Sequence, residues 1–192
     1  MTTATVPATI GATPVLRRLY FVRFGFALVW AVLLFATASS IGVLSATLIV
    51  LYPLFDVAAA VVDARSSRAG GATPRGLYVN IAISTLAAVG LALALGSGVA
   101  GVLQVWGAWA VVAGLVQLAV ALRRRALGGQ WALIASGSIS VLAGVNFVVT
   151  AAGDAASLAG VAGYALLGGV FFLVSALRLG HTAPSGRADG RE

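Results

Sequence analysis

Six long apolar segments dominate this chain and restrict its possible folds more than any other feature. They cover residues 17–37, 41–62, 76–95, 99–122, 131–150 and 158–177. About 20 apolar residues are enough for a helix to cross the roughly 30 Å hydrocarbon core of a bilayer. Of the 192 residues, 60% are hydrophobic and 9% are charged, whereas soluble domains carry about 25% charged residues. We therefore predict an all-α polytopic membrane protein with six transmembrane helices.

Two other membrane arrangements fit the segments less well. The strands of a transmembrane β-barrel alternate polar and apolar residues, and these segments do not. A helix that lies in the plane of the membrane needs a strongly charged face, which none of the six has. An in-plane helix is the alternative for one or two of the segments, but the lack of a charged face favours spanning for all six.

The basic residues all lie on one side of the predicted topology. All 12 are arginine, and they fall before or at the start of the first segment, in the loops around 63–75 and 123–125, and after residue 177. Because cytoplasmic loops are enriched in basic residues, we expect both termini in the cytoplasm. The absence of lysine and the abundance of Ala, Gly, Val and Arg fit a GC-rich bacterial coding sequence, and hence a bacterial plasma membrane. Residues 1–16 and 181–192 are expected to be disordered tails that flank a membrane domain of residues 17–180. A cleavable signal peptide at the N-terminus is the alternative.

Composition also excludes several functions. The net charge of +7 does not indicate nucleic-acid binding, because the arginines sit at the ends of apolar segments and not on a polar face. The chain has no cysteine, and its one histidine, His181, lies in the C-terminal tail. We therefore expect no metal, no cofactor and no catalytic residue, and we predict that the protein is not an enzyme.

The segments also repeat. "GAWAVVAGLVQLAVALR" (107–123) aligns without gaps with "AGYALLGGVFFLVSALR" (162–178), so that Trp109 matches Tyr164 and Gly114 matches Gly169. The stretch "IVLYPLFDVAAAVVDAR" (49–65) aligns less closely and carries Asp56 at the glycine position. We predict three helical hairpins, at about 17–65, 75–125 and 129–178, with the period of about 55 residues that a repeat protein shows.

Small residues recur at helical spacing within these hairpins. Pairs of small residues four apart let helices approach closely in lipid, where the hydrophobic effect does not drive them together. We expect such packing positions at Ala110, Gly114, Ser136, Ser140, Gly144, Ala165 and Gly169.

Asp56 is the unusual residue, because it places a carboxyl group well inside an apolar segment. It lies nine residues before Arg65, about 13 Å along the helix from that end. Arg23 lies five residues beyond Arg18 in the preceding segment, at a depth of about 8 Å by the same rise. An unpaired charge inside a membrane costs at least about 2.5–3.5 kcal/mol. We therefore predict a buried Arg23–Asp56 ion pair. The alternatives are a proton-responsive site, since intramembrane acids mark proton relays, and a side chain that reaches water.

The remaining polar and aromatic residues have simpler interpretations. Four polar residues within the segments, Asn80, Gln104, Gln117 and Asn146, are expected to hydrogen-bond neighbouring helices. Aromatic residues near the segment ends predict an interfacial belt; they are Tyr20, Trp30, Tyr78, Trp106, Trp109 and Trp131.

The second half of the chain resembles the HdeD family of bacterial inner-membrane proteins. The resemblance rests on "GAWAVVAGLVQLAVALRRR" (107–125), "GGQWALIASGSISVLAGVNFV" (128–148) and "GYALLGGVFFLVSALRL" (163–179). It implies six spans in three hairpins and a non-enzymatic role linked to acid resistance, and it carries over no binding residue. Asp56 departs from the pattern in the first repeat.

Two functions follow as hypotheses. The first is a stress-response membrane protein that acts structurally, through the lipid bilayer, as a homo-oligomer or with another membrane protein. The second is a small proton-responsive transporter or channel that uses Asp56 and Arg23, which requires a polar path into the bundle.

Overall fold

The computed structural model describes residues 12–69, 71, 73–123, 125–127, 130–153 and 156–181, and its regular secondary structure in these residues is helical throughout, with turns and short connections between the helices. The α-helices are α1 (Ala12–Ala36), α2 (Val43–Ala69), α3 (Arg75–Ala94), α4 (Gly98–Arg123), α5 (Trp131–Thr150) and α6 (Ala159–His181). Two 3-10 turns, η1 (Leu95–Ser97) and η2 (Arg125–Leu127), flank α4. The predicted all-α class is confirmed for this part of the chain, which contains no strand.

Five helical segments are long and apolar enough to cross a membrane. One of them, Arg75–Arg123, combines α3, η1 and α4. Large apolar side chains are exposed on many of the helices and not gathered in one patch, as expected for a surface that faces lipid. Examples are Val32, Phe35, Leu86, Leu93, Leu142 and Val149. By length and composition, the chain is therefore a membrane protein.

Three helix boundaries differ from the sequence prediction. Helix α6 ends at His181, so the first residue of the expected 181–192 tail is helical. Helix α1 begins at Ala12, so part of the expected 1–16 tail is helical; Pro14 is tolerated there because the first turn of a helix leaves its N–H groups unpaired anyway. Helix α2 continues to Ala69 through the predicted 63–75 loop and stops just before Gly71, whose φ of +80° favours glycine. The rest of the two expected tails, 1–11 and 182–192, lies outside the described residues.

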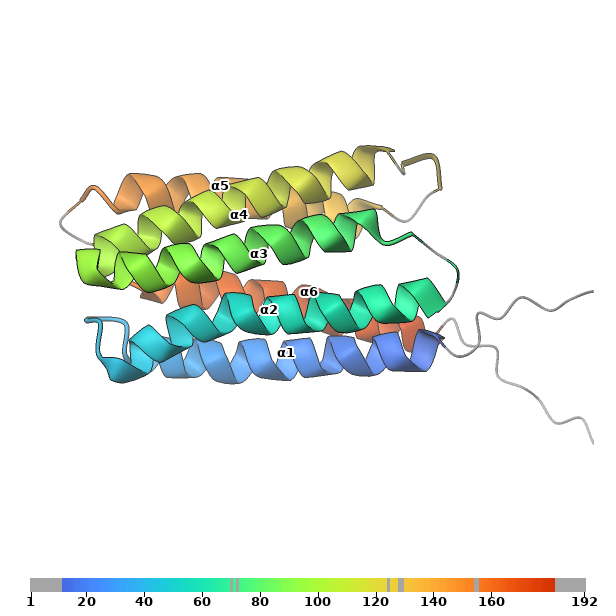
Figure 1. The fold of residues 1–192 in the computed structure, drawn as a ribbon, viewed down its shortest axis with the longest axis horizontal. Coiled ribbons are helices and arrows are strands. Elements are labelled where there is room, and N and C mark those ends of the chain that lie inside the picture. The colour runs from blue at the N-terminus through green and yellow to red at the C-terminus, as the bar shows by residue number, and fades with distance from the viewer. Residues whose placement is uncertain are drawn as a thin grey trace, which may run out of the picture.

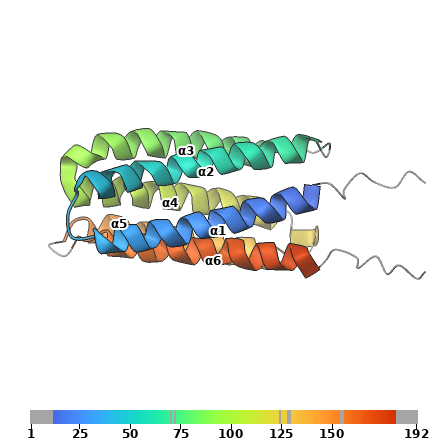
Figure 2. The same cartoon turned by 90° about the horizontal axis from the view of Figure 1, so that it is seen from below.

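The helices run side by side along one direction (Figures 1 and 2). The most extensive packing is between α4 and α5, between α1 and α6, and between α2 and α3. Helices that follow each other in the predicted hairpins pack less, and α5 and α6 contact each other least of the three. Each even-numbered helix thus packs mainly on the first helix of the next hairpin, and α6 returns to α1.

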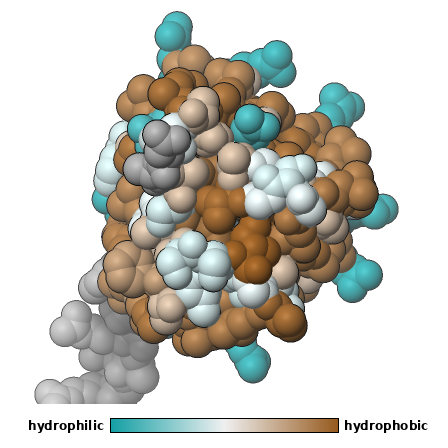
Figure 3. All heavy atoms as spheres, turned by 90° about the vertical axis from the view of Figure 1, so that its left-hand side faces the viewer, coloured by the Kyte–Doolittle hydropathy of each residue, from teal (hydrophilic) through white to brown (hydrophobic). Residues whose placement is uncertain are grey.

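The two ends of the bundle differ in charge. The start of α1 and the end of α6 lie at the same end, on the right of Figure 1, together with the arginines at the ends of α2 and α4 and the start of α3. The opposite end carries the α1–α2 turn, η1 and the α5–α6 connection. Viewed along the helices from that side, it is mostly hydrophobic or weakly polar in its centre (Figure 3).

A dense apolar core fills the half of the bundle away from the arginines. Trp30 and Trp106 are 1% and 0% exposed, and their rings stack with centroids 5.5 Å apart. The Trp30 indole N–H donates to the Leu48 carbonyl oxygen at 2.7 Å. The predicted aromatic belt is therefore wrong for these two residues, because their rings fill the space between helices. Trp131, 55% exposed at the arginine-bearing end, does lie where a belt residue should.

Candidate functional site

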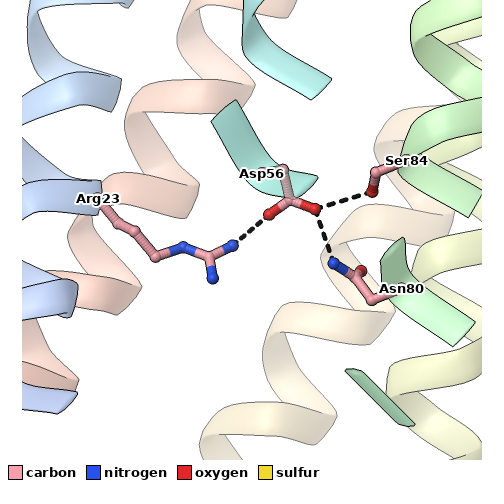
Figure 4. Close-up of polar contacts among 4 residues, drawn as sticks. All are labelled: Arg23, Asp56, Asn80 and Ser84. Carbon is pink, nitrogen blue, oxygen red and sulfur yellow. Dashed lines mark hydrogen bonds and ion pairs between the residues drawn. The ribbon is translucent and has the colours of Figure 1, made fainter. Parts of the chain in front are cut away.

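Asp56 is the centre of a polar cluster that joins three helices (Figure 4). Arg23 on α1 donates from Nη2 to Asp56 Oδ1. On the other carboxylate oxygen, Oδ2, Asn80 Nδ2 donates at 2.7 Å and Ser84 Oγ at 2.8 Å. The structure thus brings the predicted pair together, with side chains only 12% and 15% exposed.

The local sequence explains why the cluster forms. Asn80 and Ser84 are four residues apart on α3, so both face α2 at successive turns. Arg23 is held from its other side, because its guanidinium lies over the Phe172 ring of α6, 4.1 Å from the centroid, a cation–π contact. The expectation that Asn80 hydrogen-bonds a neighbouring helix is met.

A cavity of about 360 Å³ lies beside this cluster. Its lining comes from all six helices. The residues nearest the arginine-bearing end are Ala132, near the start of α5, and Ser175, near the end of α6. Its polar lining includes Tyr20, Arg23, Tyr52, Asp56, Asn80, Gln117, Ser136, Ser140, Tyr164 and Ser175. The cavity therefore occupies the half of the bundle that the apolar core leaves unfilled.

Three aromatic residues, one from each even-numbered helix, mark the inner end of the cavity. They are Tyr52, Trp109 and Tyr164. The Tyr52 ring lies 6.2 Å from Trp109 and 5.5 Å from Trp106, between centroids, and so connects the cavity to the core. The Tyr164 hydroxyl donates to Ser140 Oγ at 2.8 Å. Beyond these rings, the helices are closely packed.

Asp56 does not lie in the same kind of place as the two glycines with which the sequence aligned it. Asp56 lines the cavity together with Ala113 and Gly168, whereas Gly114 and Gly169 are buried between helices. An added Cβ on Gly169 would lie 2.9 Å from the Ala27 Cβ of α1. The carboxyl group therefore does not replace a packing glycine; it occupies a position that faces the cavity.

The expected packing positions separate into two groups. A Cβ on Gly114 would lie 2.7 Å from the Gly137 carbonyl oxygen, and one on Gly144 would lie 2.5 Å from that of Gly107, so α4 and α5 touch through their backbones. The other packing residues, Ala110, Ser140 and Ala165, are buried. Ser136 is half-buried and lines the cavity, as Ala110 and Ser140 also do.

Sequence reasoning missed several of these residues. Ser84 gave no signal of its own, because serine is common in apolar helices, although its spacing of four from Asn80 was visible. Gly107 and Gly137 each precede a predicted packing residue by seven positions, a spacing of two helical turns that identifies the same face.

The cluster holds one carboxylate between one cation and two neutral hydrogen-bond donors. Among the described residues, no group of three or more His, Cys, Asp or Glu side chains is placed to hold a metal ion. Neither a family model, a curated protein nor a solved structure matches this chain.

Proposed function

We propose that this chain is a bacterial plasma-membrane protein that crosses the bilayer six times, with both termini in the cytoplasm. The segment Arg75–Arg123 is 49 residues long, more than twice what one crossing needs. It reverses at Gly98, where φ is +71°, and α3 and α4 pack on each other. The confinement of arginine to one end supports the orientation.

We further propose that the six helices are three repeats around a central axis. With the aromatic residues Tyr52, Trp109 and Tyr164 in register, the buried positions of the three even-numbered helices also coincide. These sets are Ile49, Trp106 and Val161, then Pro53, Ala110 and Ala165, and finally Ala64, Ala121 and Ala176. The closed order of packing, α2 on α3, α4 on α5 and α6 on α1, is what a three-fold arrangement requires.

The function we propose for this architecture is non-enzymatic binding of a small molecule in the cavity, as part of its uptake, release or sensing. The observation that carries the proposal is the cavity itself, whose lining combines one paired charge with neutral polar and apolar side chains. Ligand pockets characteristically combine apolar walls with a few placed polar groups. A protein with a purely structural role has no need to leave this space open.

Cysteine labelling tests whether the cavity is reached from the cytoplasm. The chain has no native cysteine, so Ser136→Cys introduces a single thiol on the cavity wall. We expect a membrane-impermeant thiol reagent to label it in inverted vesicles and not in intact spheroplasts. Ala165→Cys, buried between helices, is the matched control and should stay unlabelled. Equal protection of both thiols from either side would refute the proposed access.

A role in acid resistance, which the HdeD resemblance implies, is the second proposal. It is favoured by the three donors around Asp56, because a carboxylate held this firmly also suits a structural protein that must stay folded under stress. The test is acid-challenge survival of a deletion strain complemented with wild type or with Asp56→Asn at matched expression. Rescue by both would assign Asp56 a structural part in that role, and no acid phenotype on deletion would remove the proposal.

A further inference from the structure

The cavity has a specific chemical character that points to one class of ligand. We infer that it binds a neutral, lipid-soluble ring compound that carries a carbonyl oxygen, with this oxygen accepting a hydrogen bond from Arg23. The inference rests on the proposed binding function and adds the ligand's chemistry to it.

The charges that line the cavity balance each other. Within the part of the chain that the structure describes, the formally charged residues of the cavity lining are one cation, Arg23, and one anion, Asp56. They pair with each other, so the lining has no net charge. A charged ligand would leave an uncompensated charge inside the membrane, which is strongly unfavourable. A neutral ligand avoids this cost.

The hydrogen-bond donors and acceptors of the ion pair do not balance. Asp56 accepts from Arg23, Asn80 and Ser84, which uses three of the roughly four acceptor sites of a carboxylate. Arg23, by contrast, has five N–H donors, and in the described residues Asp56 is its one hydrogen-bond acceptor. Figure 4 shows its other terminal nitrogen directed away from Asp56. The lining also holds one buried donor and one buried acceptor without a hydrogen-bond partner, Trp109 Nε1 and Gln117 Oε1, which offset each other. The spare donors of the site are therefore those of Arg23, and its ligand should supply an acceptor there.

Aromatic rings form much of the cavity wall. Phe26 and Phe55 both line the cavity and stack on each other with centroids 3.7 Å apart. Phe172 supports the Arg23 guanidinium, and Phe171 and Leu167 continue the same wall on α6. Planar rings pack well against such surfaces. A volume of about 360 Å³ lies at the lower end of the range of small-molecule pockets, so the ligand should be small.

Three naphthalene probes separate these features. The full-length protein in lipid nanodiscs would be titrated calorimetrically with 2-acetylnaphthalene, 2-ethylnaphthalene and 2-naphthoate, with empty nanodiscs as the blank. The probes share one ring system and differ in carrying a neutral carbonyl, no acceptor or a charge. We expect the ketone to bind about tenfold more tightly than the hydrocarbon, the effect of one good hydrogen bond, and the carboxylate to bind more weakly than the ketone.

Two substitutions locate the binding. Gly168 lines the cavity, and a Cβ added there meets no atom within 4 Å, so Gly168→Leu fills the space without disturbing the fold and should abolish ketone binding. Gly163, on the same helix, is equally open but is not part of the lining, so Gly163→Leu should bind as wild type does. Arg23→Lys keeps a positive charge beside Asp56 but lacks the second terminal nitrogen of the planar guanidinium. We therefore expect this variant to bind the ketone and the hydrocarbon with equal affinity.

Several results would overturn the inference. Equal affinities for the ketone and the hydrocarbon would show that the cavity makes no hydrogen bond to the carbonyl oxygen. A higher affinity for naphthoate than for the ketone would show that the cavity prefers an anionic ligand. Unchanged affinity of Gly168→Leu for the ketone would show that the ketone binds outside the cavity. If none of the three probes binds, this ligand class is excluded. The Ser136→Cys labelling is independent of all these probes, so failure of the ligand class and failure of the proposed access are distinguishable.

Discussion

The interface between α4 and α5 and the one between α2 and α3 join helices in the same relative order, yet they are built differently. Between α4 and α5, Gly107, Gly114, Gly137 and Gly144 bring two backbones into contact. Between α2 and α3, the carboxylate of Asp56 accepts hydrogen bonds from two side chains. The first interface forms because glycine has no side chain, so the two backbones can touch. The second interface forms only when the carboxylate and both donor side chains are present.

The difference shows two ways of fixing helices where the hydrophobic effect does not hold them together. Close backbone approach gives many weak contacts and specifies shape, but it leaves no space for a ligand. A polar cluster tolerates open space beside it, because its few contacts are directional. The cavity accordingly adjoins the polar cluster, and the glycine interface lies along its edge.

The largest expected effect comes from breaking the ion pair on one side. Arg23→Gln leaves the Asp56 carboxylate without its cation, and Asp56→Asn leaves Arg23 without its anion; each should cost about 3–5 kcal/mol of unfolding free energy and greatly reduce folded yield. Unfolding in mixed detergent micelles measures this. The double variant should recover part of the loss, because it removes both charges. If both single variants accumulate and melt like wild type, the pair does not stabilise the fold.

A smaller loss is expected from a single methyl group in the glycine interface. Gly144→Ala places a Cβ 2.5 Å from the Gly107 carbonyl oxygen and 2.8 Å from the Val111 nitrogen. Because both are backbone atoms, the helices must separate, at a cost of about 1–3 kcal/mol, measured by the same unfolding assay.

Gly163→Ala is the control for that substitution, since a Cβ there meets nothing within 4 Å and alanine favours the helix. We expect it to be neutral or slightly stabilising. Equal stability of the two alanine variants would mean that α4 and α5 are not held by close backbone contact.

The smallest expected effect comes from trimming the polar cluster. Ser84→Ala removes one hydrogen bond to Asp56 while Arg23 and Asn80 remain, and hydrogen bonds between membrane helices contribute only about 0.6 kcal/mol on average. Thr85→Ala is matched, because Thr85 Oγ1 donates to the Ile81 carbonyl oxygen of its own helix and faces outward. If Thr85→Ala lowers the unfolding free energy as much as Ser84→Ala does, the hydrogen bond from Ser84 to Asp56 makes no specific contribution to stability.

Part of the site was predictable because membrane burial restricts charge so strongly. Asp56 and Arg23 stand out in apolar segments, and each needs the other to avoid an isolated charge. The donors on α3 were less predictable, since a serine or asparagine in a membrane helix has several possible partners. The alignment placed Asp56 over Gly114 and Gly169 because it followed the glycines. Asp56 instead lines the cavity together with Ala113 and Gly168, a shared position that only the tertiary structure shows.

The sequence by itself determined that this chain is helical and suited to a membrane, since long apolar runs can satisfy their backbone groups in lipid only as helices. It also determined that Asp56 needs a partner. The tertiary structure alone decided which helices pack together, that Trp30 and Trp106 fill a core, and that a cavity lies beside the ion pair. These features depend on contacts between residues far apart in the chain, where side-chain volumes either fill the space between helices or leave it open.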